Sequence, residues 1–113
     1  MTDLPIWKFS LLDRDDAHVV ALAGELDLDA ADTVRRTLVE QLDRPTTATV
    51  VADLTDVTFV DSAALGALIG AYRHAAERDR RFIVTGAAHA VRRVMQIAGV
   101  YDLLSGAAPV PEG

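Results

Sequence analysis

Short runs of apolar and β-branched residues alternate along this chain with longer stretches in which apolar residues recur every three to four positions. The short runs predict strands at residues 6–12, 18–23, 47–53 and 81–86. A polar turn, Asp13-Arg14-Asp15-Asp16, separates the first two runs. We therefore expect these two strands to form an antiparallel hairpin.

The stretches with helical periodicity predict helices at residues 30–43, 63–78 and 89–98, with Asp27 or Asp29 as the cap of the first. Strands and helices alternate after the hairpin. This order predicts an α/β fold, with a mixed β-sheet of four to five strands, an N-terminal hairpin and helices packed mainly on one face. We expect one domain, residues 1–113, in which residues 105–113 form a flexible tail.

The helix after Ser62 has two different faces. On a helical wheel, the core face carries Leu65, Leu68, Ile69, Tyr72, Ala75 and Ala76. The opposite face carries Ser62, Gly66, Gly70, Arg73, His74 and Glu77. Each glycine costs roughly 1 kcal/mol of helix stability relative to alanine. Either another segment of the domain approaches the helix closely at these glycines, or they form a docking surface for another protein.

Ser62 itself has two candidate roles. It is the N-cap or a first-turn residue of the helix, with Asp61 as the alternative cap. Alternatively, its exposed hydroxyl accepts a phosphate at the positive end of the helix dipole. A nucleophilic serine is not supported, because Val60 and Ala64 stand where a Gly-x-Ser-x-Gly elbow has glycines.

Composition argues against several other functions. The net charge is −6 and Lys8 is the single lysine, which argues against binding to nucleic acids or anionic membranes. There is no cysteine, and His18, His74 and His89 lack metal-ligand spacing, so we expect neither a metal nor a cofactor. No apolar run approaches the roughly 20 residues of a membrane-spanning helix.

Three aspartates raise the question of a magnesium or phosphoacceptor cluster like that of response-regulator receivers. These are Asp53, Asp56 and Asp61. A receiver also needs a lysine late in the chain, which is missing here. We therefore interpret Asp53 and Asp56 as exposed turn carboxylates, and we expect no enzymatic activity.

Three short segments carry a family resemblance. Gly24-Glu25-Leu26-Asp27 follows a strand, Asp53-Leu54 ends the next predicted strand, and Val60-Asp61-Ser62 leads into Leu65-Gly66. Together they resemble a STAS domain of the anti-sigma factor antagonist type, over nearly the whole chain. The chain departs from the common family pattern at Ala63 and Ala64, where a second serine and a glycine usually follow the phosphoacceptor.

The resemblance implies a regulatory switch, and the absence of cysteine suits a location in the reducing cytoplasm. Ser62 is then phosphorylated by a partner that is both a serine kinase and an anti-sigma factor; the unmodified protein binds this partner and releases the sigma factor, and a phosphatase restores binding. No nucleic acid binding or membrane insertion is expected, and a homodimer is left open. The expected partner-binding residues are Asp27, Asp61, Ser62, Ala63, Gly66, Gly70 and Arg73.

Two other roles use the same predicted fold. One is an accessory subunit of a membrane ABC system that transports lipids, which needs no phosphorylatable serine. The other is a building block of a stress-signalling assembly in which STAS domains stack.

Overall fold

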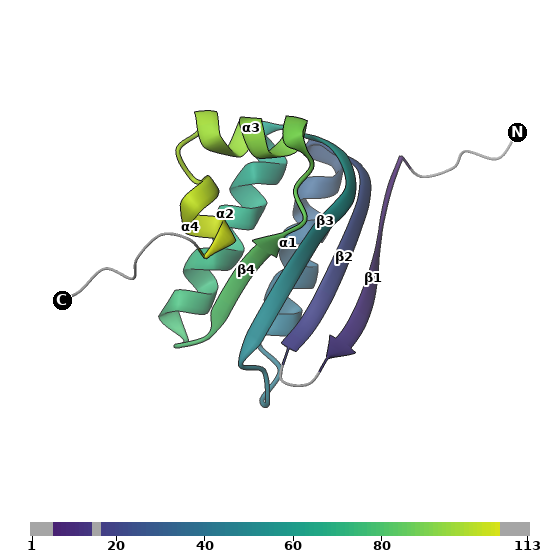
Figure 1. The fold of residues 1–113 in the computed structure, drawn as a ribbon. Helices are drawn as coiled ribbons and strands as arrows, with labels where there is room; N and C mark the ends of the chain where they lie inside the picture. Colours follow the sequence, from purple (N-terminus) through teal and green to yellow (C-terminus); the bar gives the residue numbers. More distant parts are fainter. Residues whose placement is uncertain (1–5, 15–16, 107–113) are drawn as a thin grey trace, which may run out of the picture.

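The computed structural model describes residues 6–14 and 17–106 (Figure 1). Eight elements follow one another along the chain. They are β1 (Trp7–Arg14), β2 (Ala17–Leu26), α1 (Leu28–Leu42), β3 (Thr49–Val60), α2 (Ser62–Glu77), β4 (Arg81–Thr85), α3 (His89–Ile97) and α4 (Tyr101–Ser105).

The four strands form one mixed sheet in the order β1-β2-β3-β4. β1 and β2 form the predicted antiparallel hairpin, whereas β2 and β3, and β3 and β4, run parallel. Each parallel connection contains a long helix, as expected for strands that must return to the same end of the sheet. The carboxyl ends of β2, β3 and β4 therefore lie at the same end of the molecule (Figure 1).

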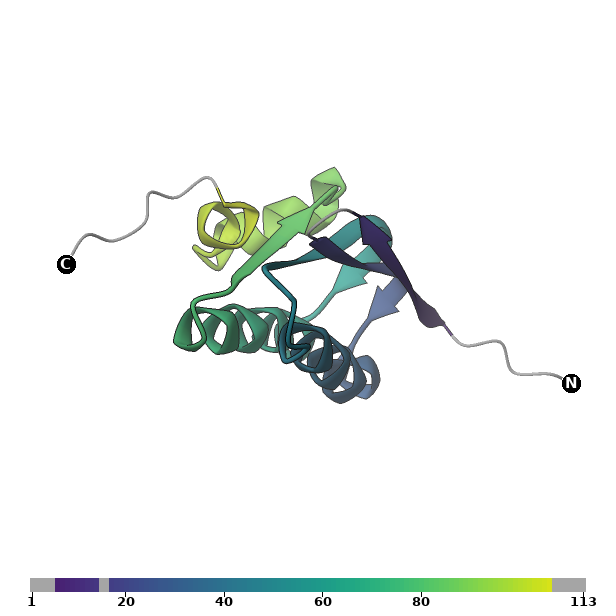
Figure 2. The same ribbon diagram turned by 90° about the horizontal axis from the view of Figure 1, so that it is seen from below.

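The two long helices cover one face of the sheet. Figure 2 shows α1 and α2 side by side below the strands, with α4 on the other side of β4. α3 crosses the end of the sheet at which β3 and β4 finish (Figure 1). The core between the sheet and the long helices is aliphatic, and its largest fully buried side chains include Leu22, Leu26, Leu38, Leu54 and Leu68.

β1 includes Asp13 and Arg14 of the predicted turn, and β2 continues to Leu26 instead of residue 23. The largest differences from the prediction lie in β3 and at the end of the described chain. β3 continues to Val60 instead of ending at residue 53, so Asp53 and Asp56 lie within a strand and not in a turn. The strand continues because residues 54, 57 and 60 are buried, with bulges in the β2–β3 pairing between them. The helix α4 was not predicted, and it includes Ser105 of the expected tail; residues 107–113 lie outside the described residues.

The buried face of α2 also differs from the helical wheel. Ala64, Ala67 and Ala71 are buried, whereas Ala76 is exposed and Ile69 and Tyr72 are only partly buried. α2 packs against α1 as well as against the sheet, and small side chains on the α1 side let the two helices approach closely. The wheel could not include this second contact, because it treats the helix as packed on one neighbour.

Candidate functional site

The ends of β2 and β3 bring two helix starts together. Leu26 pairs with Val60, and the Asp61 N–H donates to the Leu26 carbonyl at 3.1 Å. Asp27 and Asp61, the next residues on each strand, therefore begin α1 and α2 side by side. This places Leu26 and Asp27 beside the start of α2, where Ser62 lies.

Both helices begin with an aspartate cap. Asp27 Oδ1 accepts from the Asp29 N–H at 3.0 Å, and Asp61 Oδ1 accepts from the Ala64 N–H at 2.9 Å. Asp61 is thus the cap of α2, and Ser62 is the first residue of the helix. Ser62 is exposed, and its hydroxyl takes part in no hydrogen bond with the described residues. Ser62 is therefore a first-turn residue of α2 and not its N-cap. Its hydroxyl stabilises no part of the described chain through a hydrogen bond.

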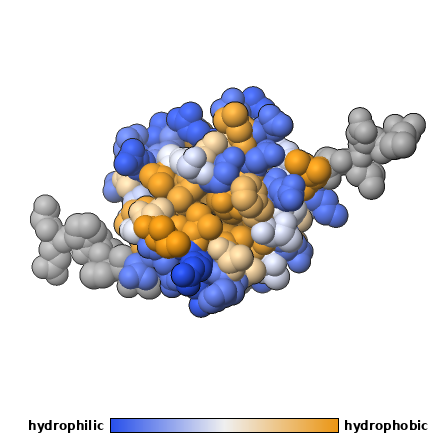
Figure 3. All heavy atoms as spheres, turned by 90° about the horizontal axis from the view of Figure 1, so that it is seen from above, coloured by the Kyte–Doolittle hydropathy of each residue, from blue (hydrophilic) through white to orange (hydrophobic). Residues whose placement is uncertain are grey.

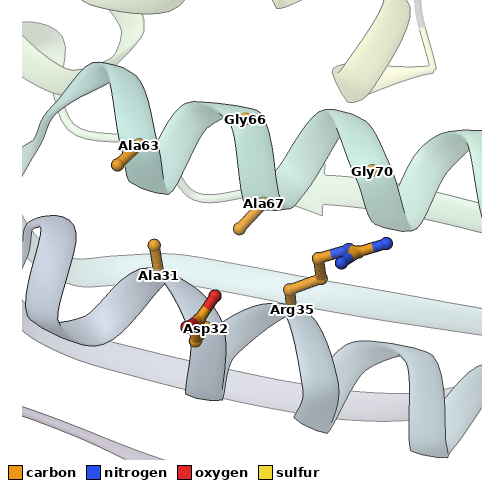
Figure 4. A pocket seen from close by; sticks show the side chains of 7 residues that line it. All are labelled: Ala31, Asp32, Arg35, Ala63, Gly66, Ala67 and Gly70. Atoms are coloured by element: carbon orange, nitrogen blue, oxygen red, sulfur yellow. The ribbon is translucent and has the colours of Figure 1, made fainter.

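A shallow groove runs from this helix start between α1 and α2. Figure 4 shows Ala63 and Ala67 of α2 pointing toward Ala31, Asp32 and Arg35 of α1. Gly66 and Gly70 lie along the same helix and complete the lining of the groove. The groove has a volume of about 380 Å³. Three of the predicted partner-binding residues, Ala63, Gly66 and Gly70, therefore line one continuous surface.

The two glycines of the groove have different surroundings. A Cβ atom at Gly70 would lie 3.3 Å from Nε of Arg35, so the absence of a side chain lets Arg35 lie across the helix. A Cβ atom at Gly66 would meet nothing within 4 Å. Close approach within the domain therefore explains Gly70 but not Gly66. For Gly66, the other explanation from the sequence analysis remains, namely a docking surface for another protein.

Arg73 lies further along α2 and does not line the groove. It is exposed, and no ion pair joins it to another described residue. The prediction that His74 lies on the exposed face with Arg73 is wrong, because its side chain is partly buried against the end of α1, with Nε2 2.7 Å from Oδ1 of Asp43. This hydrogen bond, together with the positive charges of His74, Arg78 and Arg80, holds the pKa of Asp43 below its ordinary value.

Apolar side chains gather on the end of the molecule that carries Ser62. Figure 3 views this end and shows an apolar area surrounded by hydrophilic residues. Among its exposed apolar residues are Leu28 (73% exposed), the first residue of α1, Phe59 (48%), three residues before Ser62, and Ile97 (78%) on α3. We call these three residues the apolar end.

None of the apolar end was predicted from the sequence. Leu28 could have been noticed, because it is a large apolar residue directly after a helix cap, where solvent exposure is the rule. A signal also exists in α3, where Ala90, Val94 and Ile97 are all exposed at helical spacing, while Val91 and Met95 are buried. Such a helix is apolar on two sides, and the core uses only one of them.

The histidines do not assemble a catalytic or metal site around Ser62. His18 lies 2.6 Å from Asp13 at the hairpin, and His74 lies against Asp43. Within residues 6–14 and 17–106, no group of three or more histidine and carboxylate side chains could hold a metal ion. Among the same residues, no helix is both long and apolar enough to cross a membrane.

Comparison with known proteins agrees with this arrangement. The family model described as "Mlab, STAS domain" matches residues 10–105, so the chain belongs to the STAS domain family. A curated relative, the anti-sigma-B factor antagonist of Listeria monocytogenes, is 30% identical over 99 residues, which is 86% of this chain and 85% of the relative.

Solved structures share the fold. The anti-sigma factor antagonist SpoIIAA in its unphosphorylated form superposes with a TM-score of 0.73 and 25% identity, over 83% of each chain. The phosphorylated form of the Bacillus cell fate determinant SpoIIAA superposes with a TM-score of 0.69 and 23% identity, over 87% of this chain and 88% of that one. The single mixed-sheet domain predicted from the sequence is thus confirmed.

Proposed function

We propose that this protein is an anti-sigma factor antagonist that binds its anti-sigma factor through the surface around Ser62 and loses this binding when Ser62 is phosphorylated. The observation that carries the proposal is the exposed Ser62 hydroxyl, which has no structural task because Asp61 caps the helix. The name of the Listeria relative supports the partner class, and SpoIIAA is a neighbour described in both phosphorylation states.

The helix start can accept a phosphate without loss of the fold. A phosphoserine would carry about 1.5 to 2 negative charges at the positive end of the α2 dipole. No acidic residue occupies the first turn of α2. The modification should therefore act on the partner interface and not on the stability of the domain.

The interface is sensitive to that charge for two reasons. The apolar end and the groove beside Gly66 offer a surface on which a partner excludes water, and an unpaired charge is costly in such a place. Asp27, Asp29 and Asp61 already make the helix starts acidic. A partner that fits is apolar at its centre and basic at its rim, and a phosphate on Ser62 adds to a field that the partner must already balance.

The partner in this proposal is a serine kinase as well as an anti-sigma factor, and a phosphatase reverses the modification in the cytoplasm. The protein contributes a binding surface and a phosphoacceptor and no catalytic group. Asp27, Asp61, Ala63, Gly66 and Gly70 belong to the binding surface. Arg73 extends it beyond the groove along the exposed side of α2.

The test is to incubate the purified protein with ATP and its candidate kinase and to locate phosphate by mass spectrometry. We expect one phosphate, on Ser62, and none in Ser62→Ala. Thr58→Ala is the matched control, because Thr58 is also exposed and precedes Ser62 by four residues; it should be modified like the wild type.

Partner binding gives the second readout. Ser62→Ala should keep the partner and Ser62→Asp should lose it. Equal binding by both variants would contradict the switch. Stable copurification with a membrane ATPase, with Ser62 unmodified, would instead favour the accessory role in a lipid transport system.

A further inference from the structure

The strand β1 forms an open edge of the sheet, on the opposite side from β4 (Figure 1). It is eight residues long, and it and the residue before it expose large apolar side chains: Ile6, Phe9, Leu11 and Leu12. Most edge strands of this length are short of apolar residues or are covered, because an open apolar edge pairs with other strands. Nothing among the described residues covers this one.

At every second residue the main chain of β1 is not bonded to β2. The Glu25 N–H donates to the Ile6 carbonyl at 2.9 Å, which directs the main chain of Ile6 toward β2. In an antiparallel pair with regular register the direction alternates, so Lys8 and Ser10 also bond to β2. Trp7, Phe9 and Leu11 therefore direct their N–H and carbonyl groups away from β2, toward the open edge.

The side chains of these residues share one face. Phe9 lies opposite Leu22 and Leu11 lies opposite Val20, both of which are buried in the core beneath the long helices. Trp7 and Phe9 stack on this face with ring centroids 6.1 Å apart. Yet Phe9 remains 39% exposed and Leu11 52% exposed. The free main chain and the incompletely covered apolar side chains thus belong to the same residues.

We propose that two copies of this protein pair through β1 to form a symmetric dimer, with the two strands antiparallel and the twofold axis at Phe9. Phe9 then lies opposite Phe9 of the second copy, and Trp7 of each copy lies opposite Leu11 of the other. This register forms about six main-chain hydrogen bonds. It also covers the apolar face of each edge with the same face of the other copy.

Charge selects this register over its neighbours. An axis at Leu11 would place Lys8 opposite Arg14, two like charges. An axis at Ser10 would place Trp7 opposite Asp13, whose carboxylate already binds His18 at 2.6 Å. With the axis at Phe9, Asp13 and Arg14 stay outside the paired segment.

The dimer leaves the Ser62 surface of each copy free. Two strands, β2 and β3, separate β1 from β4, and the Ser62 end is formed by the carboxyl ends of β2 and β3. Because the paired β1 strands run in opposite directions, the two Ser62 ends face opposite ways. Each copy can therefore bind its own partner, and dimer formation is independent of the proposed phosphorylation.

Sedimentation equilibrium across a concentration series tests the proposal. We expect the wild type to approach twice the 12.1 kDa chain mass, and Phe9→Lys to raise the dimer dissociation constant by at least about tenfold. Val94→Lys is the matched control, because Val94 is an apolar residue of α3, outside β1, and is 38% exposed, close to the 39% of Phe9; it should not change the constant. A wild type that stays monomeric, or a control that dissociates as readily as Phe9→Lys, would overturn the proposal.

Single cysteines test the register, because the natural chain has none. Residues opposite one another in a hydrogen-bonded antiparallel pair have Cα atoms about 5.5 Å apart, within the range of a disulfide. Phe9→Cys should therefore form a covalent dimer on mild oxidation. Leu11→Cys, on the same face of the same strand, should not, since about four residues of strand separate it from its copy. Crosslinking at Leu11 in preference to Phe9 would contradict the proposed axis.

Discussion

The two long helices start side by side and by the same construction, but their first turns differ. Both follow a parallel strand and both have an aspartate cap. The first turn of α1 contains Asp29, which opposes the positive end of the helix dipole, whereas the first turn of α2 contains no acidic residue and begins with Ser62. At the start of α1, the helix dipole is therefore already balanced by a first-turn carboxylate. At the start of α2, an added negative charge would still be stabilising.

The largest expected effect on stability comes from removing the aspartate cap of either helix. Asp27→Ala and Asp61→Ala should each lower the free energy of unfolding by about 1 kcal/mol, because each removes the acceptor of a first-turn N–H. Urea denaturation measures the loss. If Asp61→Ala costs nothing, the Ser62 hydroxyl takes over the cap, and the difference between the two helix starts disappears.

Substitution of Gly66 should change protein stability and partner binding in opposite directions. Gly66→Ala should raise the free energy of unfolding by up to about 1 kcal/mol, since alanine is the better helix former and nothing lies near its Cβ. Partner binding should weaken, because the new methyl group projects from the proposed docking surface. Gly70→Ala should gain less stability, because Arg35 must move.

Ala76→Gly is the matched control on the same helix, at an exposed position away from the groove. It should lower stability by up to about 1 kcal/mol and leave partner binding unchanged. Unchanged partner binding by Gly66→Ala would show that the groove is not part of the interface.

A carboxylate introduced at the first helical position should stabilise the protein more when it is placed in α2 than when it is placed in α1. Ser62→Asp should raise the free energy of unfolding by about 0.5 kcal/mol, through the helix dipole. Leu28→Asp makes the same change at the first residue of α1, and it should gain less, because Asp29 is already present. Thermal and urea unfolding of both variants at low salt measures the difference. An equal or larger gain at Leu28 would mean that the two helix starts are electrostatically alike.

The smallest effect is expected at the far ends of the same helices, where Asp43 follows α1 and contacts His74 of α2. The pKa of Asp43 is lowered in the folded protein, so the charged carboxylate stabilises the fold above the ordinary aspartate pKa of about 4, and this stabilisation is lost as the pH falls below it. Asp43→Asn should therefore flatten the acid limb of the stability profile. An unchanged acid limb would mean that the contact contributes nothing in solution.

Sequence periodicity predicted the hairpin, the parallel strands and the long helices because each of these elements has a regular apolar pattern. Periodicity gave wrong boundaries and wrong buried faces where contacts between elements decide which residues are buried. β3 continues through Asp53 and Asp56 because Leu54, Val57 and Val60 are buried, although its pairing with β2 is bulged there. α2 buries Ala64, Ala67 and Ala71 because it packs on α1. The roles of Asp61 and Ser62 could be listed from sequence, but only the hydrogen bond from Ala64 to Asp61 decides between them.

The affinity of the anti-sigma partner for unmodified and Ser62-phosphorylated protein, measured together with the free energy of unfolding of both forms, tests the central claim most directly. We expect phosphorylation to weaken partner binding by at least about 100-fold, the scale of a buried unpaired charge at an interface, while the free energy of unfolding stays the same or rises. Equal affinity of the two forms, or loss of binding only because the phosphorylated domain unfolds, would contradict the account.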